Sequence, residues 1–107
     1  MDEDLLTLRE KLTKLLMKSD KPLTVEEMAI FLGLNVNEYK RIYNELYHIA
    51  KTIRRKTNNR LMLYMAPPVC ESCGYVFKKL EKPKKPSKCP KCKSERISSP
   101  KFFIREN

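Results

Sequence analysis

Two pairs of cysteines constrain this chain more than any other feature of its sequence. The four cysteines form two C-x2-C pairs with 15 residues between the pairs, at Cys70, Cys73, Cys89 and Cys92. A two-residue spacing lets a tight turn aim both sulfurs at one point, and the whole pattern is typical of a four-thiolate zinc site. Because four thiolates complete a tetrahedron, we expect one structural Zn²⁺ ion and no open position for catalysis.

Other uses of the four thiols stay open. They could form two disulfides or be unrelated to one another, although a reducing compartment disfavours disulfides. Iron is a rival metal, since the paired cysteines resemble those of rubredoxin, a small electron carrier. The 15-residue spacer is short for that carrier, and its aromatic-rich core is missing here. Zinc is therefore the expected ion.

The segment that holds the cysteines, residues 68–107, has few large apolar side chains with which to bury a core. A bound metal would supply the missing folding free energy, as it does in other small metal-dependent domains. Between the cysteine pairs we expect a short strand at residues 75–77 and a Lys- and Pro-rich loop over Lys78–Lys88. The tail is therefore predicted to be a small β zinc ribbon, whose loop could contact phosphates or a protein partner.

Helical periodicity marks the preceding part of the chain. Leucines recur at steps of three and four over Asp4–Lys18, which predicts a first helix with acidic residues at its start. Thr24 and Glu27 fit a capping box that begins a second, short helix, and Gly33 fits the left-handed position that ends it. The buried face of this second helix is expected to comprise Met28, Ala29, Phe31 and Leu32.

A third helix is predicted from Asn35 or Asn37, with an apolar stripe over about four turns. The stripe comprises Tyr39, Ile42, Leu46, Ile49 and Ile53. After it we expect a β-hairpin, with a strand at Thr52–Lys56, a turn at Asn58-Asn59 and a return strand at Leu61–Met65. A short helix, a Gly-containing turn, a longer helix and a hairpin together predict a winged helix-turn-helix.

Charge is distributed unevenly along the chain, whose formal net charge is +10. Residues 1–38 carry a net charge of −3, residues 39–60 carry +6 and residues 61–107 carry +7. An acidic front and a basic middle favour an oriented contact with a polyanion such as double-stranded DNA. A solvated, Lys-rich surface is the plain alternative.

Length and composition exclude several classes of protein. A chain of 107 residues is too short for a large enzyme with a deep cleft between two domains. It also lacks a nucleophile–base pair, paired carboxylates and a Gly-rich phosphate loop, so we expect no enzymatic activity. No apolar run approaches the roughly 20 residues that span a bilayer, and the N-terminus is acidic where a secretory signal is basic. These features indicate a cytoplasmic protein without a membrane partner.

The outward face of the third helix and the wing form the predicted DNA-binding surface. A helix-turn-helix sets the N-terminal part of its last helix against base edges, where Arg can bond guanine and Asn can bond adenine. Basic residues of the wing would contact phosphates. The predicted DNA-binding residues are Asn37, Lys40, Arg41, Asn44, His48, Lys51, Arg54, Arg55, Lys56, Asn58, Asn59 and Arg60. The polar outer face that any amphipathic helix presents is the alternative interpretation.

A protein-interaction role stays open beside DNA binding. Leu61–Met65 is apolar on both faces of the predicted strand, so we expect Met62 and Tyr64 to be covered by the ribbon or by a second subunit. Tyr43 and Tyr47, at the edge of the third helix's apolar face, could also meet another protein. Such contacts would suit a homodimer, or an adaptor in a transcription or RNA-processing complex.

With these motifs, the chain resembles a small family of mainly archaeal proteins regarded as transcriptional regulators, which join a winged helix-turn-helix to a rubredoxin-like zinc ribbon. The resemblance rests on residues 32–34, 52–64, 68–77, 85–92 and 100–104. It implies that the four cysteines bind zinc, that the protein binds DNA, and that Phe102–Ile104 forms a closing strand beside the wing.

The predicted fold is thus an α+β protein with two domains. Residues 1–67 form a winged helix-turn-helix of three helices and a hairpin wing, and residues 68–107 form the zinc ribbon with a C-terminal strand.

Overall fold

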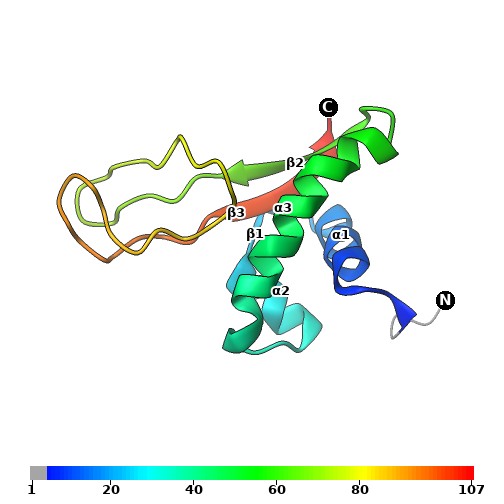
Figure 1. Ribbon diagram of the computed structural model, residues 1–107, viewed down its shortest axis with the longest axis horizontal. Coiled ribbons are helices and arrows are strands. Elements are labelled where there is room, and N and C mark those ends of the chain that lie inside the picture. The colour runs from blue at the N-terminus through cyan, green and yellow to red at the C-terminus, as the bar shows by residue number, and fades with distance from the viewer. Residues whose placement is uncertain (1–4) are drawn as a thin grey trace.

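Residues 5–107, which the computed structural model describes, fold into three α-helices and a three-stranded antiparallel sheet, with a cysteine-rich extension at one end (Figure 1). The elements in chain order are α1 (Leu8–Lys18), β1 (Leu23–Thr24), α2 (Val25–Leu32), a 3-10 turn (Val36–Glu38), α3 (Tyr39–Lys56), β2 (Leu61–Ala66) and β3 (Lys101–Glu106). The predicted α+β class is confirmed. Among the described residues, no helix is long and apolar enough to span a membrane.

Helix α1 begins at Leu8, later than predicted. The Glu10 N–H donates to Thr7 Oγ1 at 3.1 Å, and the Thr7 N–H donates to Glu10 Oε1 at 3.2 Å. This reciprocal capping box sets the helix start, and residues 5–7 precede the helix. The prediction of helix from Asp4 is therefore wrong over residues 5–7, and Asp4 itself, with the acidic residues before it, lies outside the described residues.

Helix α2 has the predicted ends but not the whole predicted face. Thr24 and Glu27 form the capping box, and Gly33 ends the helix in the left-handed conformation at φ 69°. Met28 and Ala29 are buried, whereas Phe31 is 65% exposed, so its place on the buried face was predicted wrongly. The buried stripe of this helix is centred on Val25, Met28 and Ala29, and Phe31 lies on a different side of the helix.

Helix α3 continues to Lys56, so the predicted strand at Thr52–Lys56 is wrong. The apolar stripe runs on through Ile49 and Ile53, which are buried, and burial of that helical face outweighs the β-branched residues nearby. Asn58 and Asn59 adopt positive φ angles of 53° and 65°, as their turn propensity predicts. They end a helix here and do not join two strands.

The strand that pairs with β2 comes from the other end of the chain. β2 lies antiparallel to β3, with Leu63 opposite Ile104, and β3 also pairs with β1. The sheet order is β1-β3-β2. The closing strand implied at Phe102–Ile104 is confirmed, and it replaces the predicted local hairpin partner.

The core is built from both ends of the chain. Leu12 of α1, Leu46 of α3 and Phe102 of β3 are completely buried in one cluster, and Ile104 is nearly so. Figure 1 shows α3 crossing the sheet, with α1 beside it. Residues 102 and 104 belong to the range predicted as the second domain, and they complete the core of the helical part.

Candidate metal centre and nucleic-acid interface

Both cysteine pairs fold into the same kind of turn. The Gly74 N–H donates to the Cys70 carbonyl at 2.8 Å, and the Lys93 N–H donates to the Cys89 carbonyl at 2.9 Å. Gly74 and Lys93 have φ angles of 82° and 67°, in the left-handed region that favours glycine. The second turn therefore repeats the first, with a lysine in the strained position.

The two turns bring the four sulfurs into one cluster. All four Sγ atoms lie within 4.8 Å of one another, and the Cys70–Cys92 and Cys73–Cys89 sulfurs are 3.5 and 3.6 Å apart. Disulfides would need about 2.05 Å, so these four are free thiols. A tetrahedral zinc with Zn–S distances of about 2.3 Å separates its ligands by about 3.8 Å. The cluster fits one four-coordinate zinc ion.

Main-chain donors favour thiolates at the more buried sulfur of each pair. Desolvation opposes ionisation of Cys70, but the N–H groups of Cys73 and Ser72 outweigh it and lower its pKa to about 6. Cys89 is desolvated too, yet the N–H groups of Cys92 and Lys91, 3.5 and 3.3 Å from its sulfur, lower its pKa. These donors stabilise the anionic form that a metal requires.

Four adjacent thiols cannot all ionise without a cation. The Ser94 N–H favours the Cys92 thiolate, but desolvation and the neighbouring sulfurs outweigh it and raise the pKa of Cys92 to about 12. A divalent ion bound by all four sulfurs would compensate this repulsion, and ionisation of the last thiol would follow metal binding. Two tight turns that each present two cysteines, and four soft sulfur ligands, match the chemistry of structural zinc.

Apart from this centre, the ribbon is held by main-chain hydrogen bonds, such as those from Glu71 to the Arg96 carbonyl and from Ser98 to the Val69 carbonyl, and by few apolar contacts. Its small buried cluster consists of Cys70, Cys89 and Ile97, with Phe77 packed against it. The strand predicted at residues 75–77 is present only as a single bridge between Val76 and Val69. Because the apolar cluster is so small, metal ligation is the main source of order available to this segment.

The ribbon is inserted between two paired strands. Residues 67–100 leave the sheet at the end of β2 and return at the start of β3, so they project from one end of the molecule (Figure 1). Ser99 Oγ donates to Glu26 Oε2 at 2.9 Å, which fastens the returning chain to α2. The ribbon is therefore attached to the helical part through both strands and through α2.

The N-terminal half of α3 faces the ribbon loop across a groove. The cavity there has a volume of about 810 Å³. It is lined by Asn37 of the 3-10 turn before α3, by Tyr39, Lys40, Arg41, Tyr43, Asn44 and Tyr47 of α3, and by Lys82, Pro83, Lys84 and Lys85 of the loop. The loop approaches closely, since Lys82 Nζ lies 5.3 Å from the centre of the Tyr47 ring. The tertiary fold thus places three lysines of the ribbon loop beside the N-terminal part of the predicted DNA-binding surface.

Most of the remaining predicted DNA-binding residues are divided between two other surfaces. His48 lines neither of them; it is half-buried, with its ring 6.2 Å from the Tyr47 ring. Lys51, Arg54, Arg55, Asn58 and Asn59 line a shallow hollow at the C-terminal end of α3. Lys56 and Arg60 line a different pocket, between α1 and α3. The predicted basic wing is therefore wrong as a single surface, because its first strand is helical and its side chains spread around the helix axis.

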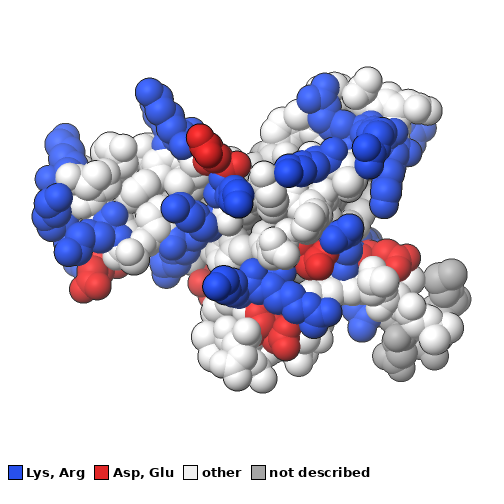
Figure 2. All heavy atoms as spheres, viewed as in Figure 1, with Lys and Arg blue, Asp and Glu red and all other residues white. Residues whose placement is uncertain are grey.

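Basic side chains dominate the visible face around these features. Figure 2 shows Lys and Arg gathered over the ribbon and over the C-terminal end of α3, with an acidic side chain between these two basic regions. Two acidic residues near the face are paired, since Arg41 lies 3.4 Å from Glu38 and Arg9 lies 2.6 Å from Glu45. Glu81, next to Lys82 on the ribbon loop, adds a carboxylate near Tyr47, and the basic residues that line the groove outnumber it.

Comparison with known proteins identifies both parts of the chain. A family model described as PF0610-like, N-terminal, matches residues 7–62, and one described as PF0610 rubredoxin-like zinc beta-ribbon domain matches residues 67–107. The solution NMR structure of protein PF0610 from Pyrococcus furiosus is 33% identical and covers 92% of this chain and 89% of that chain, with a TM-score of 0.71. No curated protein matches. The ribbon match and the sulfur cluster establish one structural zinc site.

Proposed function

This chain belongs to the PF0610-like family, and from that premise we propose that it is a DNA-binding transcriptional regulator. The order helix, strand, helix, helix, strand, strand, with the third strand in the middle of the sheet, supports a winged helix-turn-helix interpretation of the helical part. In that interpretation α3 is the recognition helix. The ribbon occupies the connection between β2 and β3, where a wing would be, so it serves as the wing.

The groove between α3 and the ribbon loop carries this proposal. Lys40, Arg41 and Asn44 are exposed on α3, and they suit contacts with phosphates and base edges. Lys82 and Lys84 stand across the groove and suit the phosphates that flank the recognition helix. The major groove of DNA is about 12 Å wide and admits an α-helix, so α3 would enter it while the loop rests on the backbone.

Salt-dependent DNA binding tests the proposal. The slope of log K against log salt should fall by about 1 for each phosphate contact removed, so Lys82→Gln/Lys84→Gln should flatten it and weaken binding to all sequences. The matched control Lys18→Gln/Lys21→Gln removes the same charge from the far end of α1 and the turn after it, and it should bind like the wild type. Binding is measured by fluorescence anisotropy on random duplexes.

Two outcomes contradict DNA binding through the groove. One is the absence of salt-sensitive affinity for duplex DNA at low ionic strength. The other is an equal loss in both double variants, which would mean that total charge, and not its position, controls binding. Zinc content and helical circular dichroism are measured for each variant, and unchanged values show that the variant is folded.

A second candidate function is a protein contact through β2, and a second copy of this chain is its proposed partner. The Asn107 N–H donates to the Arg60 carbonyl at 2.8 Å, which extends the β2–β3 ladder by one pair. In an antiparallel ladder, hydrogen-bonded and non-hydrogen-bonded pairs alternate. The main-chain N–H and C=O groups of Leu61, Leu63 and Met65 therefore point away from β3, toward the unpaired edge of β2. The Leu61 N–H accordingly bonds to Thr57 Oγ1 and not to β3.

This edge has the features of an unprotected strand. Its six residues include no charge, proline or glycine, and identical antiparallel strands can pair with each other across a twofold axis. On the outward face of the sheet, Tyr64 stacks on Phe103 with ring centres 5.3 Å apart. Met62 lies on the same face of β2 and is half-buried. Pairing of two β2 strands would join two sheets into one.

A charged residue at this edge should prevent the pairing. We expect Met62→Lys to convert a dimer into a monomer, because lysines facing each other across the twofold axis repel. Met17→Lys, the same change at a 54% exposed position on α1, is the control and should leave the dimer intact. Light scattering after size-exclusion chromatography measures the mass. A wild-type monomer at high concentration would refute the proposed partner.

A further inference from the structure

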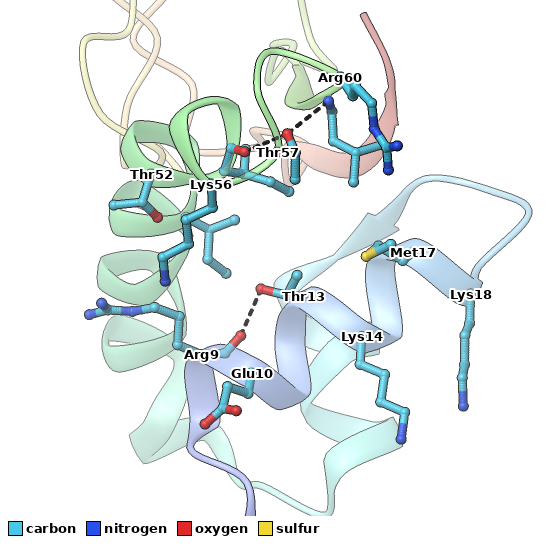
Figure 3. Close-up of a pocket in the computed structure, with 13 residues that line it drawn as sticks. Arg9, Glu10, Thr13, Lys14, Met17, Lys18, Thr52, Lys56, Thr57 and Arg60 are labelled. Carbon is cyan, nitrogen blue, oxygen red and sulfur yellow. Dashed lines mark hydrogen bonds between the residues drawn. The ribbon is translucent and has the colours of Figure 1, made fainter.

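The pocket between α1 and the C-terminal half of α3, which Lys56 and Arg60 line, is separate from the groove between α3 and the ribbon loop. Its volume is about 720 Å³, within the range of about 300–1,000 Å³ that is typical of small-molecule sites. Figure 3 shows residues of α1 on one side and Thr52, Lys56 and Thr57 on the other, with Arg60 from the loop after α3. The ribbon contributes none of the lining residues.

The interior of this pocket is apolar. Ile49 and Ile53 of α3 are buried side chains at its base, and Leu61 at the start of β2 joins them. Met17 of α1 also lines it and is 54% exposed, although large apolar side chains are usually covered. A ligand with an apolar body would cover this methionine and extend the core contacts of both helices.

The polar groups inside the pocket are already used by the fold. The hydroxyls of Thr13, Thr52 and Thr57 donate to main-chain carbonyls of their own helices at 2.9, 3.0 and 2.7 Å. Their only donor hydrogens are therefore not available to a sugar, a base or another neutral polar ligand. The Thr13 and Thr52 oxygens can still accept hydrogen bonds, so the charged groups at the opening are the donors available to an anionic ligand.

Those charged groups are almost all basic. Lys56 on α3 and Arg60 in the loop after it lie at opposite sides of the opening, whereas the ammonium groups of Lys14 and Lys18 on α1 point away from the space between the helices (Figure 3). The acidic lining residue, Glu10, stays anionic, because the Thr7 N–H and hydroxyl, 3.2 and 2.9 Å from its Oε1, lower its pKa, as does the charge of Lys56. The basic lining residues outnumber this single carboxylate. The opening therefore complements an anion, as the interior complements an aliphatic chain.

We propose that this pocket binds a small amphipathic carboxylate, an aliphatic acid whose chain fills the space between α1 and α3 and whose carboxylate is attracted by the positive charges of Lys56 and Arg60 at the opening. Charge complementarity selects the head group and the apolar lining selects the chain. The pocket is separate from the α3–ribbon groove, so the site does not depend on the proposed DNA binding.

Calorimetric titration with an alkanoate series tests the site on the zinc-loaded protein without DNA. Octanoate, nonanoate and decanoate below their micelle concentrations should bind with affinity rising by about fourfold per methylene, as burial of each CH₂ predicts. Decyltrimethylammonium has the same chain with a cationic head and should not bind. Decanol, which lacks the charge, should bind at least tenfold more weakly than decanoate.

Paired charge reversals locate the site. Lys56→Glu/Arg60→Glu should weaken decanoate at least tenfold, because both side chains line the opening and are exposed, so the change is compatible with folding. Arg54→Glu/Arg55→Glu makes the same change on the same helical turn but over the other hollow, and it should alter affinity less than twofold. Absence of decanoate binding, equal binding of the cationic analogue, or equal losses in both variants would each overturn the proposal.

Discussion

A threonine followed three residues later by a glutamate sets the start of two helices in this protein. Thr7 with Glu10 begins α1, and Thr24 with Glu27 begins α2. The Thr24 N–H stabilises the anionic Glu27 carboxylate and so lowers its pKa below the ordinary 4.5. The stability from that carboxylate is therefore present above pH 4.5 and is lost as the pH falls through the lowered pKa.

Removing one capping hydroxyl should measurably weaken the fold. We expect Thr24→Ala to lower the free energy of unfolding by about 1 kcal/mol, because the Glu27 N–H loses its acceptor at the helix start. Urea unfolding followed by circular dichroism gives the value. Thr13→Ala, in the middle of α1, is the control and should cost nothing, since alanine favours the helix interior. Equal losses at both positions would contradict the capping argument.

At the scale of single residues the sequence was a good guide. The capping box at Thr24, the left-handed Gly33 and the positive φ angles of Asn58 and Asn59 were all predicted, because each is set by local main-chain chemistry. Phe31 was predicted wrongly, because its exposure depends on which face of a two-turn helix meets the core. A short helix gives too few apolar positions to define that face from the sequence.

At the scale of elements, β3 shows how a distant segment completes a fold. Phe102 is completely buried among the helices, and its ring meets Tyr43 of α3 edge-on with centres 6.3 Å apart. Its neighbour Phe103 points to the other face of the sheet, where it stacks on Tyr64. Adjacent residues of one strand thus have different roles, because side chains alternate between the faces.

Replacing each phenylalanine by alanine should distinguish the core contact of Phe102 from the surface stacking of Phe103. We expect Phe102→Ala to cost about 3–5 kcal/mol of unfolding free energy, because it leaves a cavity in the core of the helical part. Phe103→Ala is the matched control and should cost about 1 kcal/mol, the typical value of an aromatic pair at a partly exposed site. Denaturant titration at constant zinc measures both. Similar costs would mean that β3 does not anchor the core.

The strand predicted at Thr52–Lys56 was misplaced because the true partner of β2 is far away in the sequence. The predicted strand at Thr52–Lys56 had turn residues after it and an apolar strand beyond, which together indicated a local hairpin. The true partner of β2 lies beyond the whole ribbon, and only resemblance to a family suggested it. Pairing between such distant strands leaves no periodic signal in the intervening sequence.

At the scale of the whole molecule, zinc organises a segment that connects two strands. The ribbon contains one small apolar cluster, whereas the helical part has its own large core. Loss of metal should therefore disorder residues 67–100 and leave the helices folded. The β2–β3 pairing should persist, because closure of a longer flexible loop costs little additional entropy.

Metal removal tests whether the ribbon depends on zinc while the helical part does not. The purified protein should contain one zinc per chain by elemental analysis and be colourless, whereas bound iron would absorb visible light. Chelation should collapse the amide NMR dispersion of the ribbon while helical circular dichroism is retained, and Zn²⁺ but not Mg²⁺ should restore it. Acid should release the metal, since protonation of thiolates competes with zinc. Loss of all helical signal on chelation would contradict an independent core.

The zinc ligands and the two ends of α2 were determined by the sequence alone, because each depends on residue type at short, fixed spacing. The tertiary structure decided what those parts meet. It set the ribbon loop across α3, separated Lys56 and Arg60 from Arg54 and Arg55, and formed a pocket between α1 and α3. Each of these depends on contacts between segments far apart in the chain, and such contacts are fixed only when the shared core is packed.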